Sequence, residues 1–219
     1  MTTEGDIQAM RDILVDDEFH HLNKFIFWRD LLFCSLLGWS LLFYTTFHFN
    51  IILYFLTIYL LYRATMLIHE VSHLAKKIPY YKLAYNFLLG WPNSYPAYIY
   101  DTHLFHHGKK TYGTKRDPEY SYIKKYNIII LIKPLLVSLL LPFLQWIRFG
   151  IIPIVTPFMP RKFKIKLYKS YSTLVFDVSY IRKVKNEKND LRTMMIQDLI
   201  CSCYKVCLLY TSDAADEED

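Results

Sequence analysis

The sequence has few of the residues that staple a small secreted domain or form a nucleotide-binding loop. Its 219 residues include only 4 Cys and 6 Gly. The cysteines show no spacing typical of a disulfide framework, which indicates a reducing compartment. No glycine-rich flavin or nicotinamide fingerprint is present. Residues 1–19 are polar and acid-rich without a long apolar stretch, so we expect no cleavable signal peptide.

Apolar and aromatic residues, in contrast, are abundant. Hydrophobic residues make up 53% of the chain and aromatic residues 17%, more than an ordinary soluble domain contains, which indicates that lipid surrounds much of it. The net charge of +6 comes from 26 Lys and Arg against 20 Asp and Glu. Because the lysines lie in short connections beside apolar segments, we interpret them as topology signals and headgroup contacts. We therefore expect membrane lipids as partners and no nucleic acid.

Residues 1–27 form a polar N-terminal leader, and the run that follows is apolar almost throughout. Because a helix crosses a bilayer with about 20 residues, this run predicts two spans, at about 28–48 and 50–68, joined by a tight turn at His48–Asn50. Arg63 lies near the end of the second span, where its side chain can snorkel. Basic residues in the next short loops place that face in the cytoplasm. The predicted fold class is all-α: an integral membrane helical protein with a transmembrane hairpin, cytoplasmic histidine-bearing helices and interfacial helices.

The second half of the sequence is less regular. Residues 127–160 are apolar but too few for two spans, so we expect interfacial or re-entrant helices there, with Arg148 at the headgroups. A further apolar span begins at about residue 193. Residues 207–219 include the string CLLYTSDAADE, which resembles a translated sequencing adaptor. We therefore expect 207–219 to be an artefact and the membrane domain, 28–206, to be truncated.

Five of the eight histidines lie in two clusters. His69 and His73 belong to the string HEVSH, and His103, His106 and His107 belong to HLFHH. Residues three or four apart share one face of an α-helix, so each cluster can direct its imidazoles to one centre. Neutral nitrogen donors with few carboxylates and no thiolates suit two Fe(II) ions better than magnesium, calcium or manganese. Such iron beside a membrane region indicates oxygen-dependent oxidation of a lipid C–H bond.

The segments HEVSH and THLFHHGKKTYGTKRDPEY resemble the first and second histidine boxes of the membrane fatty acid desaturase superfamily, which includes lipid hydroxylases. Box spacing and the preceding hairpin are similar too, so the resemblance covers about residues 28–192. It implies a cytoplasmic centre of two iron ions held by eight or more histidines. A third box, another His-x-x-His-His, does not occur after His107, so we expect the chain as given to be inactive. The ligands that the resemblance assigns to this chain are His69, His73, His103, His106 and His107.

The resemblance implies an enzyme that uses molecular oxygen and two electrons to introduce a double bond into a lipid acyl chain. A ferredoxin or cytochrome, with its reductase, would donate the electrons. The membrane would be the bacterial inner membrane or the endoplasmic reticulum. Lipid hydroxylation is one alternative. Another is an intramembrane zinc metalloprotease in which Glu70 of the HExxH motif acts as general base, although this leaves the second histidine cluster unexplained.

Several polar residues are candidates for orienting the ligands by accepting the second ring N–H of a histidine. Two of them lie in the DPEY run after the second cluster, where capping a turn at Pro118 is an equal alternative. His20 and His21 precede the first span without a motif, so we interpret them as solvated or interfacial. His48 lies in the predicted turn, on the far side of the membrane from the metals. The candidate orienting residues are Glu70, Asn86, Asp101, Asp117 and Glu119.

Overall fold

A computed structural model describes most of the chain. The described residues are 23–108, 110–114, 116–119, 132, 136, 139–140, 143–173, 180–184 and 186–216. Every regular element among them is a helix and none is a strand, so the all-α prediction is confirmed. Residues 1–22 of the predicted leader, including His20 and His21, and much of the predicted interfacial segment before residue 143 lie outside the described residues.

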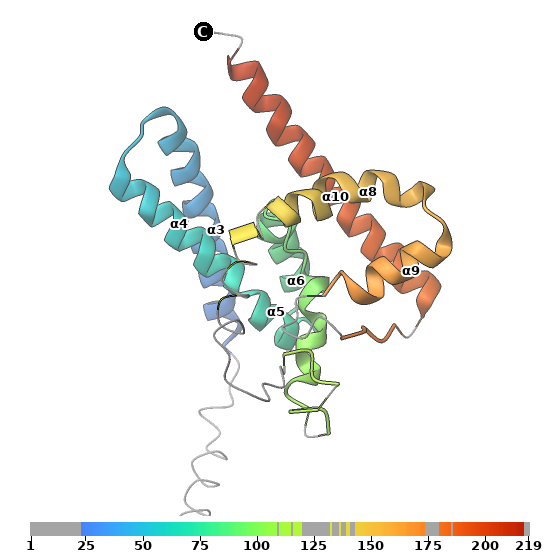
Figure 1. The fold of residues 1–219 in the computed structure, drawn as a ribbon. Helices are drawn as coiled ribbons and strands as arrows, with labels where there is room; N and C mark the ends of the chain where they lie inside the picture. Colours follow the sequence, from blue (N-terminus) through green and yellow to red (C-terminus); the bar gives the residue numbers. More distant parts are fainter. Residues whose placement is uncertain are drawn as a thin grey trace, which may run out of the picture.

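Two long helices, α3 (Lys24–Phe47) and α4 (Ile51–Met66), form an antiparallel hairpin (Figure 1). Each begins at an asparagine whose side-chain oxygen accepts hydrogen bonds from the first backbone N–H groups of the helix: Asn23 caps α3 and Asn50 caps α4. The chain between the two helices, 48–50, is the turn that the sequence predicts.

The two helices of the hairpin approach each other closely at Gly38. A Cβ atom on Gly38 would lie 2.7 Å from Cδ2 and 2.9 Å from Cγ of Leu61. Only a glycine therefore fits at this crossing without a shift of the Leu61 side chain. Deeper in the molecule, the Trp39 indole N–H donates to the carbonyl of Leu88 at 2.7 Å, which fixes the hairpin to the segment that follows it.

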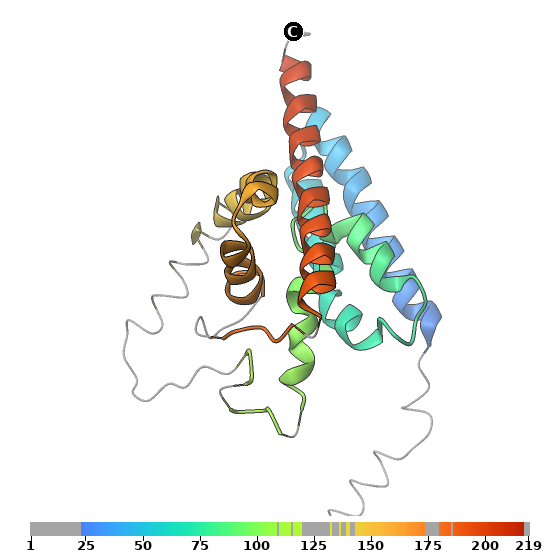
Figure 2. The same cartoon turned by 90° about the vertical axis from the view of Figure 1, so that its right-hand side faces the viewer.

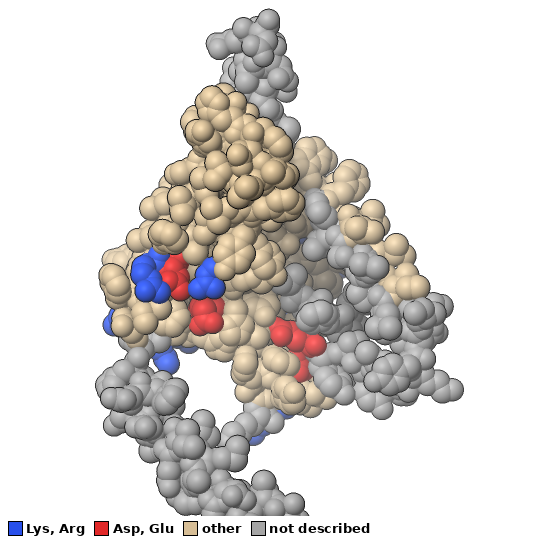
Figure 3. Space-filling model, turned by 90° about the vertical axis from the view of Figure 1, so that its left-hand side faces the viewer, with Lys and Arg blue, Asp and Glu red and all other residues tan. Residues whose placement is uncertain are grey.

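The outer surface of the hairpin is apolar. The 24 residues of α3 and the 24 residues from Ile51 to Leu74 are long and apolar enough to cross a membrane. Figure 3 shows a broad surface without charge above and the visible charged side chains gathered below it. Arg63, predicted to snorkel, lies 3.3 Å from Asp30 on the neighbouring helix. The hairpin therefore has one polar end, where the rest of the molecule begins.

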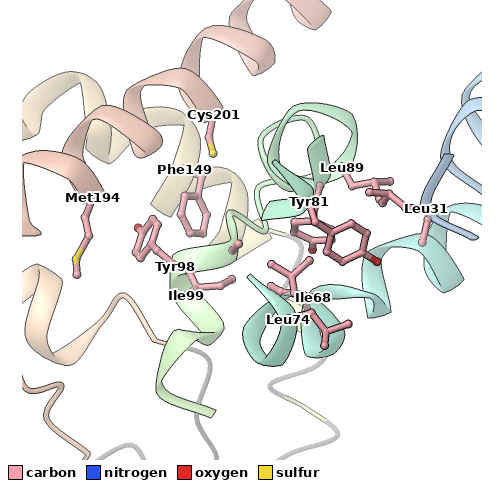
Figure 4. Packing of buried hydrophobic residues seen from close by; sticks show 14 of the residues in the cluster. Leu31, Ile68, Leu74, Tyr81, Leu89, Tyr98, Ile99, Phe149, Met194 and Cys201 are labelled. Carbon is pink, nitrogen blue, oxygen red and sulfur yellow. The ribbon is translucent and has the colours of Figure 1, made fainter. Parts of the chain in front are cut away.

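Four short helices lie at that polar end. After a break at Leu67 the chain forms α5 (Ile68–Leu74), α6 (Tyr81–Tyr85), the π-helix η1 (Asn86–Gly90) and the 3₁₀-helix η2 (Ala97–Phe105). The main core lies between these helices and the base of the hairpin (Figure 4). The fully buried Tyr81 ring packs edge-on against Trp28, 5.6 Å between ring centroids. This packing fixes α5 and η2 against the hairpin.

The second half of the chain packs on the other side of η2. An apolar stretch from Phe143 to Phe158 contains η3 (Ile147–Ile151), α8 (Ile152–Val155) and η4 (Thr156–Phe158). It is followed by the basic helix α9 (Arg161–Ser170) and by α10 (Glu187–Asp216), the longest helix among those described. In Figures 1 and 2 the far end of α10 projects in the same direction as the hairpin. The apolar segment predicted to begin near residue 193 is therefore part of a helix that starts six residues earlier.

Arg148 differs from its predicted place at the lipid headgroups. Its guanidinium lies 2.8 Å from the fully buried Asp198 carboxylate on α10, and it also donates to Ser172 Oγ at 2.6 Å. The hydroxyls of Tyr98 and Tyr168 donate to the same carboxylate. The prediction was wrong because a partner 50 residues away neutralises this arginine, which can then be buried. This network joins η2, η3, α9 and α10.

Candidate metal centre

Two short helices bring four histidines together. α5 carries His69 and His73, one turn apart, while His103 lies in η2 and His107 just beyond its end. One ring nitrogen from each lies within 4.8 Å of the others, and Nε2 of His103 and Nε2 of His107 are 2.9 Å apart. In the part of the chain that the structure describes, this is the single group of three or more potential metal ligands. The two sequence clusters therefore converge, as their spacing predicts.

The dimensions of the group fit a metal ion. Imidazole nitrogens bind a first-row metal at about 2.0–2.1 Å, so ligands on opposite sides of one ion are about 4 Å apart. The four ring nitrogens lie within 4.8 Å of one another, which is slightly more than this ligand-to-ligand distance. Four neutral nitrogen donors suit iron, zinc or copper better than magnesium or calcium. The described residues therefore supply a nearly formed site for one such ion.

Carboxylates hold three of the five clustered histidines by the ring nitrogen Nδ1. Glu70 lies 3.0 Å from Nδ1 of its neighbour His69. Glu119 accepts the Nδ1–H of His103. Both oxygens of Asp117 lie 3.0 Å from Nδ1 of His106. A carboxylate at Nδ1 fixes the tautomer and leaves Nε2 as the lone-pair donor, which is the usual arrangement around a metal-binding histidine.

The loop after η2 places two of these carboxylates. Asp117 is buried and accepts the backbone N–H groups of Gly113 and Glu119, each at 2.9 Å. Burial opposes its charge, yet these bonds and His106 lower the pKa of Asp117, which stays ionised. Asp117 therefore has both roles that were considered for the DPEY run: it accepts hydrogen bonds that close a turn, and it contacts a histidine.

His103 is the most enclosed of the four histidines, with 4% of its side chain exposed. Burial lowers its pKa, although the hydrogen bond to Glu119 acts in the opposite direction. The lowered pKa favours the neutral ring, which is the form that binds a metal.

Tyr100 is a neighbour of the site that the sequence reasoning did not single out. Its ring stacks on His103 with 4.6 Å between centroids and 12° between planes. Burial, together with the negative charge of Glu119, raises the pKa of Tyr100 to about 12. The available signal was the spacing of three residues between Tyr100 and His103, which aligns side chains on a 3₁₀-helix.

His106 is set apart from the other four. The predicted α-helix is instead a 3₁₀-helix that ends at Phe105, so positions 103, 106 and 107 do not form one α-helical face. The His106 ring is 6.0 Å from that of His103 and faces Tyr112 at 5.1 Å, while Nδ1 bonds to Asp117. His48 lies at the distant turn of the hairpin.

Two other candidate orienting residues contact other groups. The Asn86 amide accepts the backbone N–H of Ala97 at 2.7 Å and donates to Gln197 at 3.3 Å, so it anchors the start of η2. Asp101 lies 3.2 Å from the buried Arg182 guanidinium. Both side chains hold the helix that carries His103, and none of these bonds reaches a histidine ring.

Comparison with known proteins agrees with this geometry. Residues 44–181, which include all five clustered histidines, match the family model described as fatty acid desaturase. The chain is also 29% identical over 209 residues to a protein named ceramide hydroxylase from Caulobacter vibrioides (strain NA1000 / CB15N). That alignment covers 91% of this chain and 58% of the relative, so the chain spans little more than half of the relative's length. No solved structure matches.

Proposed function

Because the chain belongs to the fatty acid desaturase family, we propose that it is part of a membrane oxidoreductase that oxidises an unactivated C–H bond in a lipid acyl chain. The observation that carries the proposal is the convergence of His69, His73, His103 and His107 within 4.8 Å beside an apolar hairpin. The protein is a membrane protein by family and by its two long apolar helices. We further propose a multi-pass topology with these histidines on the cytoplasmic face.

We propose iron as the metal, because the family implies a non-haem di-iron centre and the donor set fits it. The four converging histidines would hold one ion, and His106, which is anchored separately by Asp117, is the candidate ligand for the second. When bound, iron would supply the redox chemistry with oxygen that no side chain offers. An electron donor, a ferredoxin or cytochrome with its reductase, completes the proposal.

The residues of the chain have three tasks in this function. Glu70 and Glu119 hold the rings of His69 and His103 in the tautomer that presents Nε2. The hairpin provides apolar surface at which lipid chains lie. At its base a groove of about 460 Å³, lined by Ile26, Phe27, Met66 and Leu67 among others, reaches Glu70. We propose this groove as the path by which an acyl chain leaves the bilayer for the metal centre.

Two outcomes share the first step, removal of a hydrogen from the acyl chain. Loss of a second hydrogen gives the double bond that the sequence predicts, whereas addition of oxygen gives an alcohol. The similarity to a ceramide hydroxylase favours hydroxylation as the second candidate and a ceramide-like lipid as the substrate to try first. The match to the fatty acid desaturase family favours a lipid oxidoreductase over the zinc protease alternative.

Product analysis tests the proposal. Because the family resemblance implies a third histidine box that this chain lacks, the assay uses the coding sequence read through residue 206 in the source nucleic acid. Membranes containing this protein, a reductase system and a ceramide are incubated under labelled oxygen. A lipid product with one labelled oxygen indicates hydroxylation, and one that has lost two hydrogens indicates desaturation.

A pair of histidine variants provides the control. His73→Ala removes one of the four converging ligands and should abolish the product. His48→Ala removes an exposed histidine at the distant turn and should leave the product yield unchanged. Full turnover by His73→Ala, or equal loss in both variants, would show that the histidine assignment is incorrect.

A further inference from the structure

A second pocket lies against η2 and is rich in lysine. It has a volume of about 460 Å³ and is enclosed by the end of α5, the start of α6, η2, the segment 182–184 and the first turns of α10. With three residues per turn, Tyr100 and His103 form one ridge of η2, whereas Tyr98 and Asp101 form a neighbouring ridge that lines this pocket. The pocket is therefore separate from the metal centre, although one helix serves both.

Cations outnumber anions around the pocket. Four cationic side chains line it, Lys76, Lys82, Arg182 and Lys183, against two carboxylates. Asp101, one of the carboxylates, lies 3.2 Å from the Arg182 guanidinium, and the Arg182 side chain is only 2% exposed.

The acidic groups are already engaged by other partners. The Asp190 carboxylate accepts the backbone N–H of Asn186 at 3.1 Å. Lys82 also attracts Asp101, but the single charge of that carboxylate is shared with Arg182. In the described part of the chain the ion pairs do not include Lys76, Lys82 or Lys183. The four cations and two carboxylates therefore leave an excess of two positive charges around the space, and its three lysines make no ion pair in the described part of the chain.

Arg182 makes the floor of the pocket rigid. Its guanidinium donates to the carbonyls of Tyr98 at 2.8 Å and Ser172 at 2.9 Å, and to the Thr173 hydroxyl at 2.9 Å. The wall beside it is apolar, because Phe105, Val184 and Met194 also line the space. The site thus combines one arginine held by hydrogen bonds and three lysines with a hydrophobic side.

We propose that this pocket binds a phosphate group carried on a molecule with an apolar portion. A phosphate has up to two negative charges and several acceptor oxygens, which match three lysines better than a single carboxylate does. The pocket volume lies in the range of small-ligand sites and exceeds what a bare phosphate fills. The phosphate is borne either by a lipid headgroup or by a soluble ester, and the experiment separates these sources.

The test is a binding titration on the purified full chain in detergent. The probes are short-chain phosphatidate, the corresponding diacylglycerol without phosphate, and phenyl phosphate. The test variant is Lys76→Gln/Lys82→Gln/Lys183→Gln. The control variant, Lys77→Gln/Lys162→Gln/Lys166→Gln, loses the same charge from exposed lysines that do not line the pocket.

We expect the test variant to lose phosphatidate affinity about tenfold or more, because each charge-assisted hydrogen bond contributes to binding. The control variant should lose less than about twofold. The diacylglycerol should bind more weakly to the native chain than phosphatidate does. Equal dependence of phenyl phosphate on the same lysines would assign the site to phosphate esters in general, whereas binding of phosphatidate alone would assign it to lipid. Equal weakening in both triple variants, or in neither, would overturn the proposal. Retained helical content and Co²⁺ binding in both variants exclude misfolding, and no readout depends on lipid oxidation.

Discussion

The hydrogen bonds between carboxylates and histidines predict a graded response of metal affinity. Substitution of a group that orients a ligand histidine typically weakens metal binding about 10–100-fold, or about 1.4–2.7 kcal/mol. Glu119→Gln removes the charge beside His103, where the glutamate side chain is only 14% exposed, and we expect a loss of about tenfold because the stacked Tyr100 still restrains the ring. Glu70→Gln acts on His69 from a side chain that is 38% exposed, so solvent reduces the effect to about threefold.

The assay is titration of the purified chain with Co²⁺, followed by its visible absorption and by competition with a chelator. Asp101→Asn is the matched control, because it removes a carboxylate from the helix that carries His103 without touching a histidine. We expect its affinity to stay within about twofold of the native value. The reasoning would be refuted by equal losses for Glu119→Gln and Asp101→Asn, or by a larger loss for Glu70→Gln than for Glu119→Gln.

Three further predictions concern packing around the site. Arg148→Met or Asp198→Asn alone should cost about 3–5 kcal/mol of unfolding free energy by leaving one buried group without its partner, and the double variant should cost much less than the sum; additive losses in denaturant unfolding would contradict this. Gly38→Ala should destabilise the hairpin by about 1–3 kcal/mol because its Cβ meets Leu61, and by less in a Leu61→Ala background; thermal unfolding of the four proteins measures the difference. Tyr100→Phe keeps the ring stack and should weaken Co²⁺ binding only a few-fold, whereas Tyr100→Leu should weaken it about tenfold; identical affinities would show that the stack is irrelevant.

The hairpin and the histidine pairs could be predicted because each depends on a short stretch of sequence. The length of an apolar span is set by bilayer thickness, and the polar residues His48 and Asn50 mark the turn. The spacing of His69 and His73 by four residues places both on one side of any α-helix. The motif itself was therefore sufficient to predict which two histidines α5 presents at the candidate metal centre.

The remainder depended on distant partners or on helix type. Arg148 lies in an apolar segment, which predicts a lipid headgroup contact. Its actual partner, Asp198, is distant in the sequence and is visible only in the structure. His106 follows the end of the 3₁₀-helix η2 at Phe105, and spacing alone does not distinguish that helix from the α-helix that the histidine pattern predicts. Glu119 was a candidate from its position in the DPEY run, but its particular histidine depended on the path of the loop.

The long 3₁₀-helix η2 restricts how this region can change over evolution. Its three-residue repeat places Tyr100 and His103 toward the histidines, and Tyr98 and Asp101 toward the lysine-rich pocket. Substitutions there alter one surface at a time. Insertion or deletion of one residue between Tyr98 and His103 would rotate everything beyond it by about 120° and move His103 away from the other histidines. Homologous sequences should therefore differ in residue type along this stretch. Insertions or deletions there should be absent or should comprise three residues, which is one turn of the helix.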